Sequence, residues 1–275
     1  MILSELQTAI LELFKNKLSK PSRIKRLSYP LISRISNEYL QNRVVVVGQE
    51  TNTWYPKTED DFHKEFLGSS LKEIERKALI ERYDKFVDEE VEEYGGHFWE
   101  FNRQLYKRNI INGWIVTKER RLNHCWINLF VMEACKDKED DSGRPSKREN
   151  STLRNEIISL QKDIVFQLLK LLSPKLVIFL TGHNLDYFLF NFTINDSDPK
   201  LIKLHNKLDT KEACQILSKN PYWKDTVMIR LYHPTYFMGR INANKKIKDR
   251  IGLHYKVSDF YTEVVFEFLS KNYSF

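Results

Sequence analysis

Residues 43–48 read Arg-Val-Val-Val-Val-Gly, a continuous β-branched run that ends at a glycine. β-branched side chains favour strands, and a run without polar alternation indicates a strand that is buried on both faces. Three later apolar runs repeat this pattern, over 124–132, 176–182 and 226–234. The segments between them have helical spacing, so the sequence predicts strands and helices in alternation.

The predicted helices cover 3–18, 29–40, 62–94 (as one or two helices), 98–109, 151–172 and 257–272. Strands that alternate with helices favour a parallel sheet with helices on both of its faces. The expected fold is therefore α/β, with a central four-stranded, mostly parallel sheet between two helical layers.

No internal repeat divides the 275 residues, so we expect one domain over 1–275. Two insertions interrupt its pattern, a charged helical segment at 57–96 and a polar loop at 135–150. The first insertion holds thirteen acids and seven bases, which gives 7 − 13 = −6. Because acids repel DNA, we expect this segment to lie away from any DNA-binding groove.

Composition excludes several classes of protein. The chain is 41% hydrophobic with only 9 Gly and 8 Pro, which argues against fibrous and broadly disordered classes. No apolar run approaches the roughly 18 residues of a membrane span, and Glu5 and Glu12 favour an amphipathic N-terminal helix over a signal peptide. Three cysteines without a CxxC pair argue against a disulfide framework or a metal site. We expect a cytoplasmic protein with no membrane contact.

The net charge of +7 is unevenly distributed. Basic residues gather in 15–26, which has no acid, and in 239–256, which has Asp249 alone. Such clusters supply the sequence-independent attraction to phosphate that nucleic-acid binders need. A solvated surface explains them equally well. The candidate DNA contacts in the second cluster are Arg240, Lys245 and Lys246.

Ligands of parallel sheets bind at the carboxyl ends of the strands. Gln49 and Glu50 follow the first predicted strand, Asn128 lies in the second, and His233 follows the fourth. Together they could position a water, bind the edge of a planar base and stabilise a leaving anion. Each also has a structural explanation: Glu50 as a helix cap, Asn128 as a partner of the backbone, His233 as a turn residue.

Four short motifs, taken in order, resemble the uracil-DNA glycosylase superfamily. They are VVVVGQETNTWY, WINLF, LVIFLTG and LYHPTYF, and the resemblance covers about 43–240. The family carries a GQDPY-type motif after its first strand, an Asn on its second and an HPS-type motif after its fourth. The resemblance implies a monomeric DNA glycosylase that needs no cofactor and hydrolyses the N-glycosidic bond of an everted pyrimidine in double- or single-stranded DNA.

The resemblance also implies a role for each matched residue. Glu50 would orient or activate water, and His233 would face the departing base anion. Asn128 would read the edge of the base, and Gln49 would contribute mostly backbone contact. A loop after the histidine would press into the duplex; its residues are Tyr236, Phe237 and Met238.

Three positions depart from the family pattern. Glu50 replaces an Asp and is one methylene longer, so the water would sit differently. Thr51-Asn52 stands where the family has Pro-Tyr, and that tyrosine blocks the 5-methyl group of thymine. Asn52 should therefore open space around C5 of the base, unless Trp54 or Tyr55 refills it. We expect the substrate to be a 5-substituted pyrimidine rather than plain uracil.

The stacking aromatic is left open among Phe98, Trp99 and Phe101. Two other function classes compete with a glycosylase. One is a catalytically weak nucleic-acid-binding protein on the same fold, and the other is a hydrolase of free nucleosides or nucleotides. The cellular role is also open, between base-excision repair and restriction of foreign (phage) DNA that carries modified bases.

Overall fold

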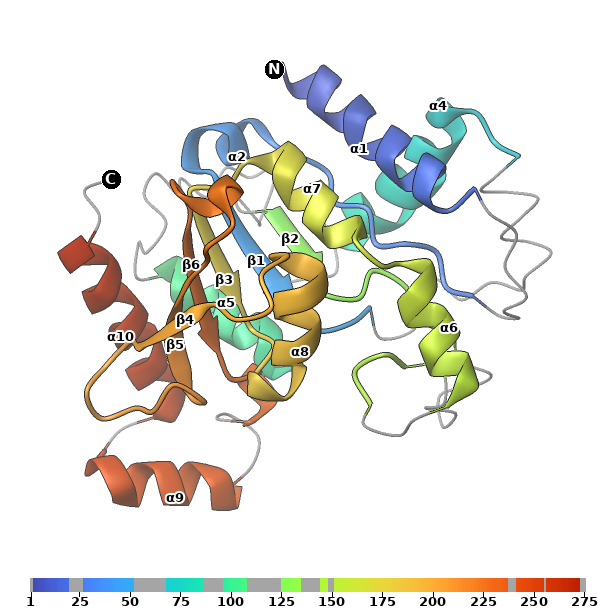
Figure 1. Cartoon of the computed structure of the whole chain (residues 1–275). Helices are drawn as coiled ribbons and strands as arrows, with labels where there is room; N and C mark the ends of the chain where they lie inside the picture. The colour runs from blue at the N-terminus through green and yellow to red at the C-terminus, as the bar shows by residue number, and fades with distance from the viewer. Residues whose placement is uncertain are drawn as a thin grey trace.

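The computed structural model describes residues 2–19, 27–51, 68–86, 96–107, 125–134, 144–147, 151–236, 241–254 and 256–272. Its sheet has the strand order β2-β1-β3-β6-β5-β4 (Figure 1). The strands are β1 (Val44–Gly48), β2 (Cys125–Asn128), β3 (Leu176–Phe179), β4 (Lys200–Lys203), β5 (Ala213–Leu217) and β6 (Val227–Leu231).

The four predicted strands are present, and they form the parallel part of the sheet as β2, β1, β3 and β6. The α/β class is confirmed, but within the described residues the sheet has six strands rather than four. The two additional strands, β5 and β4, are antiparallel and continue the sheet beyond β6. Three of the four residues of β4 are exposed, so this strand lacks the apolar run that predicts the four parallel strands.

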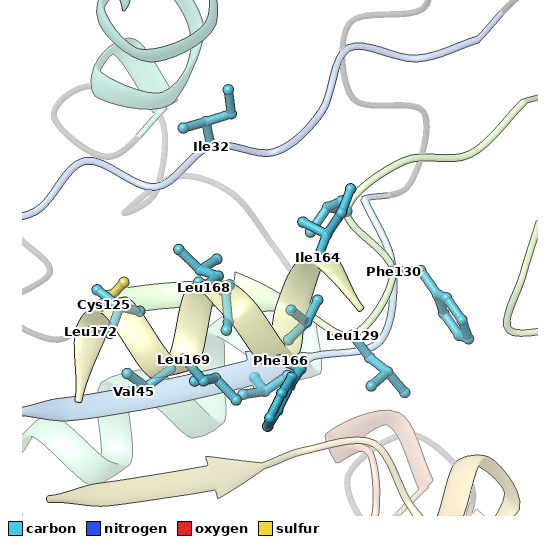
Figure 2. Close-up of a cluster of buried hydrophobic side chains, with 14 of the residues drawn as sticks. Ile32, Val45, Cys125, Leu129, Phe130, Ile164, Phe166, Leu168, Leu169 and Leu172 are labelled. Atoms are coloured by element: carbon cyan, nitrogen blue, oxygen red, sulfur yellow. The ribbon is translucent and has the colours of Figure 1, made fainter. Parts of the chain in front are cut away.

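Strand β1 explains why the sheet has a helical layer on each face. All five of its residues are buried. Val45 and Val47 belong to the core beneath α1 and α7, whereas Val44 and Val46 belong to the core beneath α5, α9 and α10. Figure 2 shows α7 lying along β1, with its leucines beside Val45. A strand with two apolar faces requires both helical layers.

The helices of the described ranges alternate with these strands. The α-helices are α1 (Leu3–Lys17), α2 (Asn37–Asn42), α4 (Leu71–Ile74), α5 (His97–Lys107), α6 (Thr152–Leu160), α7 (Ile164–Leu172), α8 (Asp186–Phe188), α9 (Ile241–Ile251) and α10 (Val257–Asn272). The 3₁₀ and π segments are η2 (Glu75–Asp84), η4 (His183–Leu185), η5 (Leu189–Thr193) and η6 (Pro221–Trp223).

Two helix predictions are wrong. Within 29–40 only the part in α2 is helical, and just before it Ser28 and Leu31 donate backbone hydrogen bonds to the segment after β2. The helix predicted over 151–172 is divided at 161–163 into α6 and α7, with Asp163 at a φ of 66°. Gln161 lies in that break, and its buried amide binds the backbone N–H and C=O of Met132.

The charged insertion packs against β2. Of its residues, 68–86 and Gly96 are within the described ranges. Tyr83 and Phe86 are buried and pack against Trp126, with ring centroids 6.0 and 5.8 Å away. The aromatic side chains of this acidic segment thus support the sheet edge, which its net charge alone did not indicate. In the polar loop, only 144–147 is described.

Two cysteines are free and buried, Cys125 at the start of β2 and Cys214 in β5. Burial raises the pKa of the Cys125 thiol to about 12 and that of the Cys214 thiol to about 11. Both therefore stay protonated at neutral pH.

Candidate functional site at the carboxyl edge of the sheet

Gly48 and Asn128 end the first two strands at the same level. They are register partners, and the pairing continues as the Leu129 N–H donates to the Gly48 carbonyl at 2.9 Å. A Cβ atom on residue 48 would lie 2.3 Å from Asn128 Oδ1. No side chain other than hydrogen fits there without moving the amide. Glycine at position 48 therefore leaves room for Asn128.

The amide of Asn128 is buried and half satisfied. The residue is 1% exposed, and its Oδ1 accepts a hydrogen bond from Trp126 Nε1–H at 3.2 Å. Its Nδ2 is buried and has no hydrogen-bond partner within the described residues. Leaving a buried donor unsatisfied costs about 1–3 kcal/mol, and such groups are rare. This donor is therefore available to a ligand that carries an acceptor.

Phe98 closes the site from the first turn of α5. Two atoms of its ring lie 3.2 and 3.4 Å from the Cβ position of Gly48. The same ring lies against the His233 imidazole, with centroids 6.1 Å apart and planes at 23°. Phe98 is thus the aromatic that reaches Asn128 and His233. Of the other two candidates, Phe101 is 0% exposed in the core, and Trp99 packs edge-on against Trp126.

His233 is held as a neutral hydrogen-bond donor. Burial, and to a lesser extent the nearby His97, lower its pKa from 6.5 to about 4. Its Nδ1 accepts from the Thr235 backbone N–H at 3.3 Å. Because a neutral imidazole carries one proton, that proton is on Nε2. The ring therefore presents an N–H at neutral pH without carrying a charge.

Glu50 lies two residues beyond Gly48, but its carboxylate is directed elsewhere. Its Oε2 accepts from the Ser146 backbone N–H at 3.2 Å. Glu50 also attracts Arg154, whose pKa is lowered by burial despite that attraction. Among the described residues, no hydrogen bond joins Glu50 to Asn128 or His233. The structure brings Asn128, Phe98 and His233 together and leaves Glu50 at the margin.

Gln49 ties neighbouring strands together. Its Nε2 donates to the Thr181 carbonyl at 2.8 Å, which joins the end of β1 to the end of β3. Beyond Thr181, Gly182 at a φ of 70° donates its N–H to the Leu231 carbonyl at the end of β6. The hydroxyls of Thr51 and Thr181 are buried there and lack partners within the described residues. The ends of three strands thus meet at one edge.

The predicted DNA contacts are only partly described. Tyr236 stacks on Tyr232 with ring centroids 4.2 Å apart, and it packs against the core instead of projecting freely. Lys245 and Lys246 are exposed on α9. The predicted residues that lie outside the described ranges are Asn52, Trp54, Tyr55, Phe237, Met238 and Arg240.

Two residues of the site escaped the sequence reasoning. Trp126 precedes Asn128 by two positions, so the period of a strand puts both on one face. That spacing was a usable signal for the indole–amide contact. In the sequence, Gly48 indicates only the end of a strand. Its spatial requirement comes from Asn128, which is eighty positions away in the chain, so no local signal existed.

A separate small cavity lies among α6, α7, α8, η5 and the chain after β2. Its volume is about 20 Å³, and it is lined by Leu129, Phe130, Ile158, Gln161, Lys162, Asp163, Val165, Phe188, Phe192 and Thr193. That space holds about one water molecule and is too small for a pyrimidine ring. It is therefore not the candidate site.

No protein-family model matches the chain, and no curated protein shows significant similarity to it. Among the described residues, no helix is long and apolar enough to cross a membrane. Within the same ranges, no group of three or more His, Cys, Asp or Glu side chains could hold a metal ion.

Proposed function

We propose that this protein is a DNA glycosylase that hydrolyses the N-glycosidic bond of an everted pyrimidine and leaves an abasic site. The observation that carries the proposal is that Asn128 and Phe98 meet at Gly48 and that the Phe98 ring also lies against His233. An unpaired amide donor, an aromatic face and a neutral imidazole N–H are the groups that bind a planar base and stabilise its anion.

Phe98 supplies the stacking surface. Taking a base out of the duplex costs a few kcal/mol, and stacking on an aromatic ring returns about 1–3 kcal/mol per base. The Phe98 ring is only partly buried and packs against two core clusters, so it is held in place. A base bound on it would lie near both Asn128 and His233, which border the same ring.

His233 favours departure of the base. As the bond from C1′ to the base breaks, positive charge develops on the sugar and negative charge on the base. Water adds its hydroxyl to C1′, and its second proton goes to the carboxylate or to solvent; the base anion is then protonated. A neutral N–H aimed at the base oxygen stabilises that anion, and losing such a donor typically lowers turnover about 10²- to 10³-fold.

Glu50 is the proposed partner of the attacking water. Its carboxylate would favour the positive sugar and align the water. In this structure it accepts from the Ser146 N–H, which fixes one oxygen and leaves the other able to accept. The proposed substrate is still a 5-substituted pyrimidine. That preference was argued from Asn52, which lies outside the described residues. The proposed cellular roles, base-excision repair and restriction of modified foreign DNA, stay alternatives.

One observation favours a second candidate, a nucleic-acid-binding protein that has lost the chemistry. The Glu50 carboxylate is directed to Ser146 and Arg154 rather than toward His233. If that arrangement persists when DNA is bound, the site would hold a base without activating water.

Single-turnover release of free bases tests both candidates. Duplex and single-stranded oligonucleotides carrying uracil, 5-substituted uracils or 5-substituted cytosines are incubated with excess protein, and released bases are identified by mass spectrometry. We expect release of at least one base, and we expect E50Q and H233A to lower turnover far more than DNA affinity. Free nucleosides serve as the matched substrate control.

Each outcome assigns the site differently. Tight DNA binding without release of any base favours the second candidate. Cleavage of free nucleosides that long DNA does not inhibit indicates a nucleoside hydrolase. Full activity in E50Q or in H233A removes that residue from the mechanism.

A further inference from the structure

Trp126 and Asn128 lie on the same face of β2 because they are two positions apart in a strand. Their side chains are joined by the hydrogen bond from Trp126 Nε1–H to Asn128 Oδ1, at 3.2 Å. An indole N–H can only donate, so the amide atom that faces it must be the oxygen. The contact therefore fixes which end of the amide points which way, a choice that the shape of an amide alone leaves open.

The indole itself has little freedom to move. Trp126 is 6% exposed, and it packs against aromatic rings from two other elements. The centroid of Trp99 lies 4.7 Å away at an interplanar angle of 80°, and that of Phe98 lies 6.2 Å away. Tyr83 and Phe86 complete the enclosure from the charged insertion. Rigid surroundings of this kind hold a recognition group in one orientation before a ligand arrives.

The opposite orientation of the amide is disfavoured by the indole. It would place the Asn128 NH₂ group against the indole N–H, so two donors would face each other. The atom left for a ligand is Nδ2, which is buried and unpaired within the described residues.

We propose that Trp126 is a positioning residue that locks the Asn128 amide with its N–H groups toward the base, so that the site selects pyrimidines with a carbonyl at the edge that Asn128 reads. This inference rests on the proposed function and narrows the class of base that the site would accept. A 4-oxo base offers an acceptor to Nδ2, whereas a 4-amino base offers a second donor and leaves both groups unpaired. Sites built on such hydrogen bonds discriminate strongly against the mismatched analogue.

The test compares single-turnover excision of two bases that carry the same C5 substituent, a 5-substituted uracil and the matching cytosine, by wild type and W126F. Phenylalanine keeps an aromatic ring but lacks the N–H, so the amide is free to turn. We expect the uracil-to-cytosine rate ratio to fall about tenfold or more in W126F. W99F is the matched control, because it removes an indole from the same cluster without touching Asn128, and its ratio should stay at the wild-type value.

An unchanged ratio in W126F, or an equal fall in W99F, would overturn the proposal. A second variant covers the case in which W126F does not fold: N128D keeps an acceptor for the indole but has no N–H at pH 8, so it should lose excision of the uracil.

A measurement independent of activity separates this inference from the proposed function. In ¹H–¹⁵N spectra, the Trp126 indole N–H should exchange slowly in wild type and at least tenfold faster in N128A, which removes its acceptor. If wild type releases no base while the indole N–H is protected, the proposed function fails and the hydrogen bond stands. If the indole N–H exchanges equally fast in both proteins, the positioning role fails, whatever the activity.

Discussion

His233 makes the stability of the chain sensitive to pH. Its pKa is lowered from 6.5 to about 4. Between pH 4 and pH 6.5 the unfolded chain therefore binds a proton at this side chain that the folded chain does not bind. The free energy of unfolding therefore falls as the pH is lowered from about 6.5 to about 4, and this contribution is absent above that range. Urea unfolding at pH 7 and pH 5 should show a smaller decline in H233N than in wild type. An identical decline in the two proteins would contradict the lowered pKa of His233.

Gly48 allows a second test at the scale of single residues. In G48A the new Cβ would collide with Asn128 Oδ1, and strain of this kind typically costs about 1–3 kcal/mol. The cost should be smaller in an N128A background, because the amide is gone. A double-mutant cycle from urea unfolding measures the difference. Equal losses in both backgrounds would mean that Phe98, 3.2 Å from the same position, causes the strain instead.

Single residues were predictable where they broke a local pattern. Asn128 was found because it is an amide within an apolar run, and His233 because it follows a strand. The sequence could not show that Phe98 rather than Phe101 lies at the site, because the two residues are three positions apart on the same helix, α5. Only the packing shows that Phe101 is in the core and Phe98 against His233. The direction of the Glu50 carboxylate depends on Ser146, which is 96 positions away.

At the scale of elements, β6 is joined to α8 by a buried ion pair. The Arg230 side chain is 1% exposed, and its Nε lies 3.1 Å from Asp186 Oδ1. It also donates to the carbonyls of Thr210 and Lys211, both at 2.6 Å. Burial raises the pKa of the Asp186 carboxyl to about 6 even though Arg230 lowers it. Desolvation thus outweighs the attraction for this carboxylate.

Removal of Arg230 should be costly and should depend on pH. We expect R230M to lower the free energy of unfolding by about 3–5 kcal/mol, because it leaves Asp186 without its partner. The raised pKa of Asp186 means that its charged form is the unfavourable one, so the loss should be larger at pH 8 than at pH 5. R230M/D186N should recover stability at pH 8. A loss that does not change with pH would assign the cost to the two carbonyls.

The bounds of helices were predictable where the apolar periodicity of the sequence determines them. They were not predictable where a contact with a distant part of the chain determines them. The helix over 257–272 was predicted with the bounds of α10, because its apolar face repeats regularly. The break between α6 and α7 depends on the bond of Gln161 to Met132, which periodicity does not contain. Likewise, 29–36 is not helical although its spacing suits a helix, and the Leu31 N–H there bonds to the Val131 carbonyl after β2.

At the scale of the whole molecule, charge decides where DNA is expected to bind. Lys245 and Lys246 are exposed on α9, whereas Arg250 of the same helix is engaged by Glu212. We expect K245E/K246E to weaken DNA binding and to reduce the slope of log affinity against log salt by about 0.9 for each lost phosphate contact. Fluorescence anisotropy over a salt series measures both quantities.

The matched control for that experiment is K200E/K203E. It makes the same change in net charge with two exposed lysines of β4, at the edge of the sheet opposite β2. Its salt slope should stay close to that of wild type. Equal weakening in the two double variants would show that only net charge matters and would remove α9 from the interface.

The sequence predicted the α/β class and the four parallel strands, since long apolar runs need no tertiary information. It did not predict that the sheet continues through β5 and β4. Strand β4, Lys-Leu-Ile-Lys, is short and mostly exposed, and it forms only because β5 is already present beside it. Lysines at both of its ends also discourage pairing with another chain.

Cys125 begins the outermost parallel strand, three positions before Asn128, and its protonated thiol is shielded from solvent. A thiol reagent can reach it only when the packing around β2 opens. In a background that lacks the other two cysteines, the rate of alkylation therefore measures opening around the strand that holds Asn128, the proposed base-reading residue. Slower alkylation in the presence of an oligonucleotide would reveal occupancy without any catalytic turnover.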